Sequence, residues 1–253
     1  MYPVLGRFLI TEMLGGFLLV LLGGTGSTGL EVYYKHAIWL TGVSGIVAVF
    51  PCLYWYRKDV LRRRVGGLQK EKRALRVRET VLILLLGAAS AFYFSLLVGM
   101  FLLPYYGQYQ ETMQQITNGN SLLWQILWIG IAAPFAEEVV FRWMVYLRMR
   151  DYIRYVPAMV FSGLIFGICH GNLVQAVYAW ILGIIFAFLL EKTGNLWSCV
   201  LAHMGANVFS LIHPEICMAL PERGLVIYIL VILVVFLGVI FGGIYYFARY
   251  RAK

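Results

Sequence analysis

A set of polar residues stands out because its members lie inside otherwise apolar stretches. The set is Glu137, Glu138 and Arg142 in IAAPFAEEVVFRW, His170 at the end of FGICH, and His203 and Asn207 in HMGAN. Ionisable side chains at membrane depth are costly, so they indicate a functional site that faces a bundle interior or a wet cavity. Carboxylates, imidazoles, a guanidinium and a carboxamide together could activate a water molecule and stabilise a developing negative charge.

The two carboxylates are adjacent, and helix geometry gives them different surroundings. Arg142 follows Glu138 by four residues, so the two share a helix face and can form an ion pair. Glu137 points about 100° away from Glu138 at 3.6 residues per turn. Arg142 would keep Glu138 charged, which leaves Glu137 as a general base made stronger by its apolar surroundings. Pro134 removes a backbone hydrogen bond and is expected to open the helix just before the pair.

The remaining polar residues suggest partners for that base. His170 could share the water molecule and deliver a proton later. His203 and Asn207 lie four residues apart on one helix face and offer donors for an oxyanion. A covalent nucleophile is not required, and the nearby serines are expected to serve helix packing. These are Ser162, Ser198 and Ser210.

A metal site built from the same residues is an alternative interpretation. Glu137, His170 and His203 are acceptable zinc ligands. The sequence lacks the HExxH helix that presents two histidines and a base together. We therefore favour a mechanism without a cofactor, and keep zinc as the alternative.

Composition indicates which elements must hold these residues. Hydrophobic residues make up 61% of the 253 residues, charged residues only 13%, and the mean hydropathy is +0.78. A membrane helix needs roughly 20 apolar residues, and the apolar runs are continuous. The sequence predicts an all-α polytopic bundle with about eight transmembrane helices. They are expected near 7–23, 37–56, 80–103, 121–147, 156–171, 173–190, 195–213 and 224–248.

The basic residues predict the orientation of this bundle. The net charge is +9, and ten of the 21 basic residues lie between Arg57 and Arg78. Eight spans place 18 of the 21, Arg7 included, on one side, which the positive-inside rule identifies as the cytoplasm. Both termini are then cytoplasmic. The segment could contact anionic lipid, and nothing accompanies it that would indicate a nucleic-acid partner.

The chain is expected to form a single integral membrane domain, 1–253. Residues 1–120 would be scaffold spans with the basic loop 57–78, residues 121–213 the catalytic core, and residues 214–253 the last span and a basic tail. A proton-coupled transporter could also use buried Glu and His, but it predicts pseudo-symmetric halves, and we find none. A membrane scaffold that regulates a partner protein is a further alternative.

The three motifs together resemble those of a known family. EEVVFR, FGICH and HMGAN look like the EExxxR, FxxxH and HxxxN motifs of the CAAX protease and bacteriocin-processing family, which includes the type 2 CAAX prenyl endopeptidases. They occur in the family's order, over about residues 121–213. The resemblance implies an intramembrane glutamic-type peptidase of a bacterial plasma membrane. It also implies lipidated or membrane-associated peptide substrates, or a role in bacteriocin immunity.

That resemblance implies the same division of roles as the residues themselves. Glu137 and His170 would activate water, and Glu138 and Arg142 would support them. His203 and Asn207 would stabilise the oxyanion.

Overall fold

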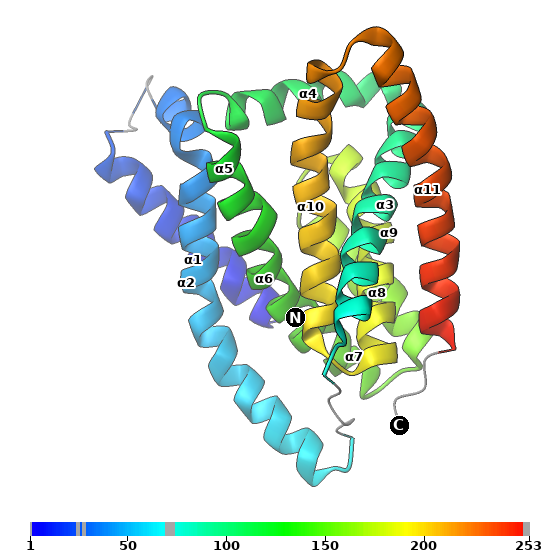
Figure 1. Ribbon diagram of the computed structural model, residues 1–253. Coiled ribbons are helices and arrows are strands. Elements are labelled where there is room, and N and C mark those ends of the chain that lie inside the picture. Colours follow the sequence, from blue (N-terminus) through cyan, green and yellow to red (C-terminus); the bar gives the residue numbers. More distant parts are fainter. Residues whose placement is uncertain (1, 24–25, 27–28, 69–73, 250–253) are drawn as a thin grey trace.

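The computed structural model describes residues 2–23, 26, 29–68 and 74–249, and these residues form an all-α bundle (Figure 1). The first helices are α1 (Tyr2–Leu21), α2 (Gly29–Val65), α3 (Val77–Phe101) and α4 (Leu103–Thr117). A continuous helical segment follows, divided into α5 (Leu122–Gln125), η2 (Ile126–Ala132), α6 (Ala133–Glu138), η3 (Val139–Tyr146) and α7 (Leu147–Arg150), where η denotes π-helix. The last helices are α8 (Tyr155–Ile168), α9 (Leu173–Thr193), α10 (Leu196–Ala219) and α11 (Glu222–Ala248). Five residues assigned to the basic loop and tail lie outside the described residues: Lys70, Lys72, Arg73, Arg251 and Lys253.

The predicted all-α polytopic class is confirmed, with one change in the spans. Within the described residues, seven helices are long and apolar enough to cross a membrane, namely α1, α2, α3, the α5–α7 segment, α9, α10 and α11. The expected span 156–171 is the 14-residue helix α8. At 1.5 Å per residue it is about 21 Å long, less than the roughly 30 Å of a hydrocarbon core. It packs along α9 as a hairpin, so the chain returns to the side from which α8 began.

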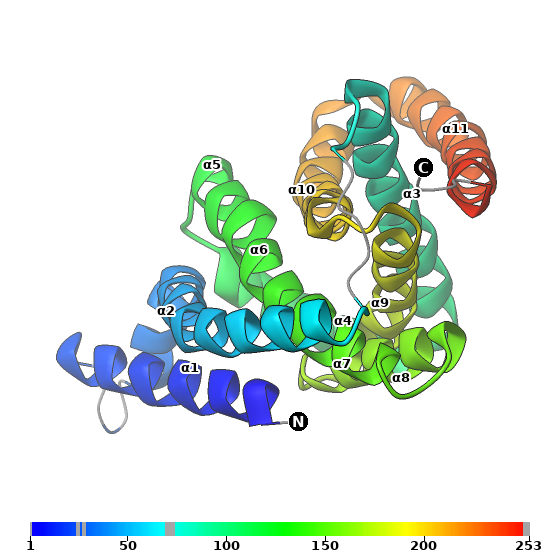
Figure 2. The same ribbon diagram turned by 90° about the horizontal axis from the view of Figure 1, so that it is seen from below.

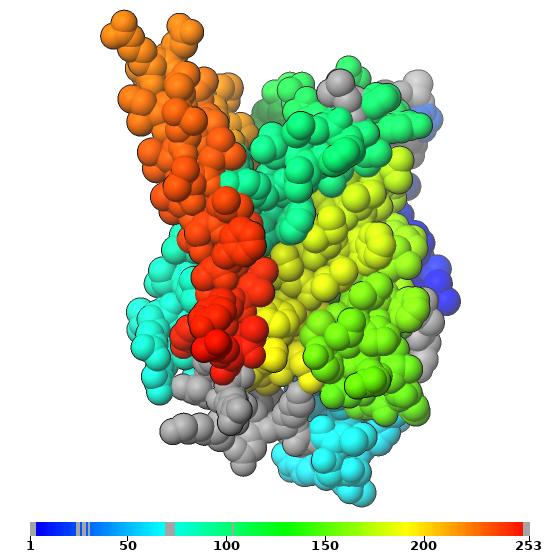
Figure 3. Space-filling model, turned by 90° about the vertical axis from the view of Figure 1, so that its right-hand side faces the viewer, coloured from blue at the N-terminus to red at the C-terminus, as the bar shows by residue number. Residues whose placement is uncertain are grey.

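One end of the bundle is covered by a helix that lies between two of the expected spans, 80–103 and 121–147. Most of 105–120 is helical and belongs to α4, which lies across that end above α8 and α9 (Figures 1 and 3). The hydroxyls of Tyr109 and Tyr178 lie 3.0 Å apart and join α4 to α9. Helix α4, which precedes the α5–α7 segment, is therefore packed against the core.

Small residues let α3 and α10 pack almost in backbone contact. A Cβ atom added at Gly87 would lie 1.8 Å from the carbonyl oxygen of Ala202, and one at Gly205 would lie 2.2 Å from that of Leu84. Close approach through small residues is a common way for membrane helices to associate. Gly205 belongs to the HMGAN motif, so this contact fixes the helix that carries His203.

The opposite end of the bundle collects basic residues, as the charge pattern predicted. The 37-residue helix α2 is about 55 Å long and projects beyond the other helices at this end (Figure 1). Arg63 near its end contacts Asp151 at 2.6 Å, and Arg148 of α7 contacts Asp59 of α2 at 2.5 Å. These ion pairs join α2 to the end of the α5–α7 segment. That this end faces the cytoplasm stays a prediction.

Candidate active site

The segment that carries the two glutamates is a helix interrupted by two π-helical stretches, η2 before α6 and η3 after it. In a π-helix the carbonyl of residue i accepts from the amide of i+5, so the donor for Ile129 would be residue 134. That residue is proline, which has no amide hydrogen. Asn207 of α10 takes its place, and its Nδ2 donates to the Ile129 oxygen at 2.9 Å. Pro134 thus removes a backbone hydrogen bond before the glutamates, as predicted, but the segment stays helical through it. The freed carbonyl is bonded to α10 instead.

Glu138 is fully buried, and both of its oxygens have partners. Oε2 lies 2.8 Å from Nε of Arg142, and neither side chain is exposed to any degree (0%). Oε1 lies 3.0 Å from Nδ1 of His203. A carboxylate accepts only, so Nδ1 carries a hydrogen and the imidazole is oriented with Nε2 toward Glu137. The predicted pairing of Glu138 with Arg142 is confirmed, and the structure adds His203 as a third member of this group.

The guanidinium of Arg142 lies between aromatic rings. Its Cζ is 4.7 Å from the ring centre of Phe166 and 5.5 Å from that of Phe186. A Cβ added at Gly183 would lie 3.5 Å from Nη2 of Arg142 and 2.8 Å from Cα of Gly163. The terminal nitrogens have no hydrogen-bond acceptor among the described residues, so the ring faces offset part of the cost of burying the cation.

Glu137 has a different environment from its neighbour. Its side chain is 20% exposed, and its Oε2 lies 3.9 Å from Nε2 of His203. Its Oε1 lies 3.6 Å from Nη2 of Arg7. The sequence placed Arg7 at the start of the first span, among the residues expected on the cytoplasmic side, and did not predict its contact with Glu137. The side chain turns inward because its cation meets a carboxylate there that it would lack in lipid.

His170 is held at the site by contacts with Phe166, the aromatic residue of its own motif. It lies just after α8, and its Nδ1 is 2.8 Å from the carbonyl oxygen of Phe166. The Phe166 ring meets the rings of His170 and His203 edge to face, at 4.7 and 5.6 Å. Glu137 lies within electrostatic reach of both histidines. A carbonyl accepts only, so the hydrogen is on Nδ1, and the Nε2 of a neutral ring is free to accept a proton.

The serines have the packing role that the sequence predicted. Each hydroxyl donates to a backbone carbonyl in or next to its own helix: Ser162 to Met159, Ser198 to Asn195 and Ser210 to Ala206. None of these bonds involves a base that could activate a nucleophile.

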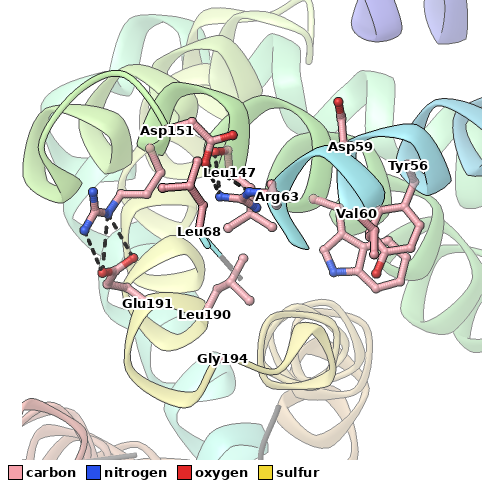
Figure 4. Close-up of a pocket in the computed structure, with 12 residues that line it drawn as sticks. Tyr56, Asp59, Val60, Arg63, Leu68, Leu147, Asp151, Leu190, Glu191 and Gly194 are labelled. Carbon is pink, nitrogen blue, oxygen red and sulfur yellow. Dashed lines mark hydrogen bonds and ion pairs between the residues drawn. The ribbon is translucent and has the colours of Figure 1, made fainter. Parts of the chain in front are cut away.

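A cavity of about 190 Å³ lies near the basic end, where η3 and α7 meet α2 and α9 (Figure 4). Trp143 of η3 and Leu147 of α7 line it on one side, and Leu190 lines it from α9. Two ion pairs border it, Arg63 with Asp151 and Arg150 with Glu191. Of the candidate site residues, none lines this cavity, although Trp143 directly follows Arg142 in the chain.

The residues considered as zinc ligands do not gather into a ligand set. In the described part of the chain, no three His, Cys, Asp or Glu side chains are grouped so that they could hold a metal ion. His203 already faces Glu138 at hydrogen-bonding distance. The donor set does not fit zinc in this arrangement, so no step below passes through a metal.

The fold and the site define a class of protein: a polytopic α-helical membrane protein, whose helices Figure 2 shows from below. Buried glutamate, arginine and histidine side chains meet inside it. Residues 119–209 match the family model described as type II CAAX prenyl endopeptidase, Rce1-like, so this region is similar to Rce1-like CAAX proteases. The matched segment contains all three motifs.

Two curated relatives match parts of the chain. The chain is 31% identical over 83 residues to "Putative membrane peptidase YdiL" of Bacillus subtilis (strain 168), covering 33% of this chain and 34% of that one. It is 26% identical over 157 residues to the membrane-embedded CAAX protease MroQ of Staphylococcus aureus (strain USA300), covering 57% and 64%. The chain thus spans about a third of the length of the first relative and less than two thirds of the length of the second. No solved structure gives a significant match. The family and these names suggest membrane protease activity.

Proposed function

We propose that the chain is an intramembrane endopeptidase that hydrolyses peptide bonds with water activated by Glu137 and His170. The observation that carries this proposal is the difference between the two adjacent carboxylates. Glu138 is buried and held by Arg142 and His203, whereas Glu137 is partly exposed, lies 3.9 Å from His203 and is within electrostatic reach of His170. Neighbouring titratable groups in contrasting environments are characteristic of acid–base sites.

The reaction uses one water molecule and no covalent intermediate. Glu137 takes a proton from a water molecule as the water oxygen attacks the scissile carbonyl carbon. The electron pair of the C=O bond moves onto the carbonyl oxygen. When the tetrahedral intermediate collapses, the C–N bond breaks and the amine leaves with a proton relayed from Glu137, assisted by His170. The products are a carboxylic acid and an amine.

The oxyanion would lie on the α10 side of the site. One amide hydrogen of Asn207 is used by the Ile129 carbonyl, and the second is available to a substrate oxygen. When Nε2 of His203 carries a hydrogen, it can donate toward the same position. A donor aimed at the developing charge contributes roughly 10²–10³ in rate.

The substrate class follows from the location of the site rather than from a binding motif. A site within a membrane bundle receives peptides that are themselves in or attached to the membrane, so we propose membrane-associated or lipidated peptides. Both CAAX-type cleavage near a lipidated cysteine and maturation of a peptide pheromone or bacteriocin fit this class. If the basic end is cytoplasmic, substrates enter from that side or laterally from lipid.

The test is cleavage of a fluorogenic peptide by the purified protein in detergent. Glu137→Gln is expected to abolish turnover while the protein unfolds at about the wild-type temperature. Glu111→Gln serves as a matched control, because that glutamate is exposed on α4. Wild-type turnover by Glu137→Gln would refute the assignment and would favour a scaffold or a transporter. If the variant is inactive, it can then be used to trap substrates in native membranes.

Chelation separates the two forms of water activation. The metal-free mechanism predicts unchanged turnover after treatment with a strong chelator. Loss of activity that added zinc restores would instead establish the zinc-dependent alternative.

A further inference from the structure

Arg7 is a charged residue in the first membrane helix whose side chain reaches the proposed catalytic base. Its guanidinium passes beside Gly45 of α2, where an added Cβ would lie 3.9 Å from Nη2. It then lies over the ring of Phe141, with Cζ 5.8 Å from the ring centre, and its Nη2 is 3.6 Å from Oε1 of Glu137. The side chain is only 18% exposed.

An arginine inside a membrane helix needs a compensating charge, because its transfer into hydrocarbon is costly. The Nε of Arg7 is buried without a hydrogen-bond acceptor among the described residues. Four groups that carry or can carry positive charge lie near Glu137: Arg7, Arg142, His170 and His203. Arg142 and His203 are both engaged by Glu138, and His170 is bonded to a carbonyl. Arg7 is therefore the permanent cation available to Glu137.

We propose that Arg7 is a positioning residue for the water-activating Glu137, a role that rests on the function proposed above. Its charge holds the carboxylate on the side of the site that faces the histidines. Helix α1 otherwise contacts mainly α2 and carries many exposed apolar side chains, so its contact with η3 at the site is a specific one. If Arg7 served only to anchor α1, its charge would not need to lie beside Oε1 of Glu137.

Peptidase kinetics of Arg7→Gln and Arg7→Lys in the full chain test this role. Misplacing a catalytic group by about 1 Å can cost on the order of a hundredfold in rate. We expect Arg7→Gln to lower kcat by about ten- to a hundredfold with little change in KM. Lysine keeps the charge, so Arg7→Lys should recover most of the loss. Arg148→Gln is the matched control, because Arg148 and Asp59 form an ion pair of similar exposure elsewhere, and its kcat should not change.

Three outcomes would overturn the proposal. They are a wild-type kcat in Arg7→Gln, no recovery with lysine, and a faster Arg7→Gln enzyme, which would make Arg7 a plug that obstructs the site. A second measurement does not depend on peptidase activity. In a thermal-unfolding cycle of Arg7→Gln, Glu137→Gln and the double variant, we expect the effects to be non-additive, because the two side chains interact.

Additive effects in that cycle would overturn the positioning role even if no substrate is cleaved. If the effects are non-additive but the wild-type protein cleaves no peptide, the proposed function is contradicted, while the contact between Arg7 and Glu137 stands.

Discussion

The buried group formed by Glu138, Arg142 and His203 gives the sharpest stability prediction. Replacing Glu138 by glutamine keeps the shape of the side chain and removes its negative charge. Arg142 would then remain as a cation with no exposed surface and no carboxylate at 2.8 Å. Removing one partner of a buried ion pair typically costs about 3–5 kcal/mol, because the other charge stays buried without compensation.

That cost is large enough to measure by thermal unfolding. For a domain of this size, 1 kcal/mol corresponds to a change in Tm of roughly 2–4 °C, so Glu138→Gln should lower Tm by about 6–20 °C. The unfolding of purified protein is compared in one detergent by intrinsic fluorescence. Glu137→Gln is the reference, because Glu137 is 20% exposed and its contact with Arg7 is longer. A partly solvated pair of this kind contributes about 1 kcal/mol or less.

A second variant tests whether the cost arises from the uncompensated charge. Combining Glu138→Gln with Arg142→Met removes both charges, and the methionine packs against the same rings. Replacing a buried ion pair with apolar groups is often close to neutral, so the double variant should be more stable than Glu138→Gln alone. The reasoning is refuted if Glu138→Gln unfolds at the wild-type temperature, or if Glu137→Gln is the less stable single variant.

Two further predictions concern α10. Gly205→Ala should destabilise the protein by about 1–3 kcal/mol through overpacking against Leu84, whereas Gly16→Ala, with no atom within 4 Å of the new Cβ, should unfold like wild type. Asn207→Leu should lower kcat by roughly 10²–10³ if its amide stabilises the oxyanion. Its control is Ser210→Ala, since that hydroxyl bonds only within its own helix; equal kcat values for the two variants would remove Asn207 from the mechanism.

The sequence predicted best those contacts that lie within one helix. Spacing alone placed Arg142 beside Glu138 and turned Glu137 away, because positions four apart lie on one face of any regular helix. Pro134 signalled the missing backbone hydrogen bond before the pair for an equally local reason. These predictions required no knowledge of how the helices pack.

Contacts between helices could not be predicted from the sequence. An arginine near the start of an apolar run is an ordinary topology signal, so nothing local distinguished Arg7 from its counterparts in the loops. The same holds for His203, whose spacing to Asn207 indicated a shared face but not that the ring meets Glu138. Phe166 belongs to the FGICH motif, but the sequence did not predict that its ring would contact Arg142 and both histidines.

The small residues of the motif helices explain how the site is held together. Gly205 brings α10 against α3 at backbone distance, and His203 lies two residues earlier on the same helix. A bulkier residue at position 205 would push α10 away from α3 and move the imidazole relative to both glutamates. The glycine in HMGAN therefore contributes to the site through its lack of a side chain, and its effect on catalysis should follow the displacement of His203. That displacement would first break the 3.0 Å contact with Glu138, which orients the ring.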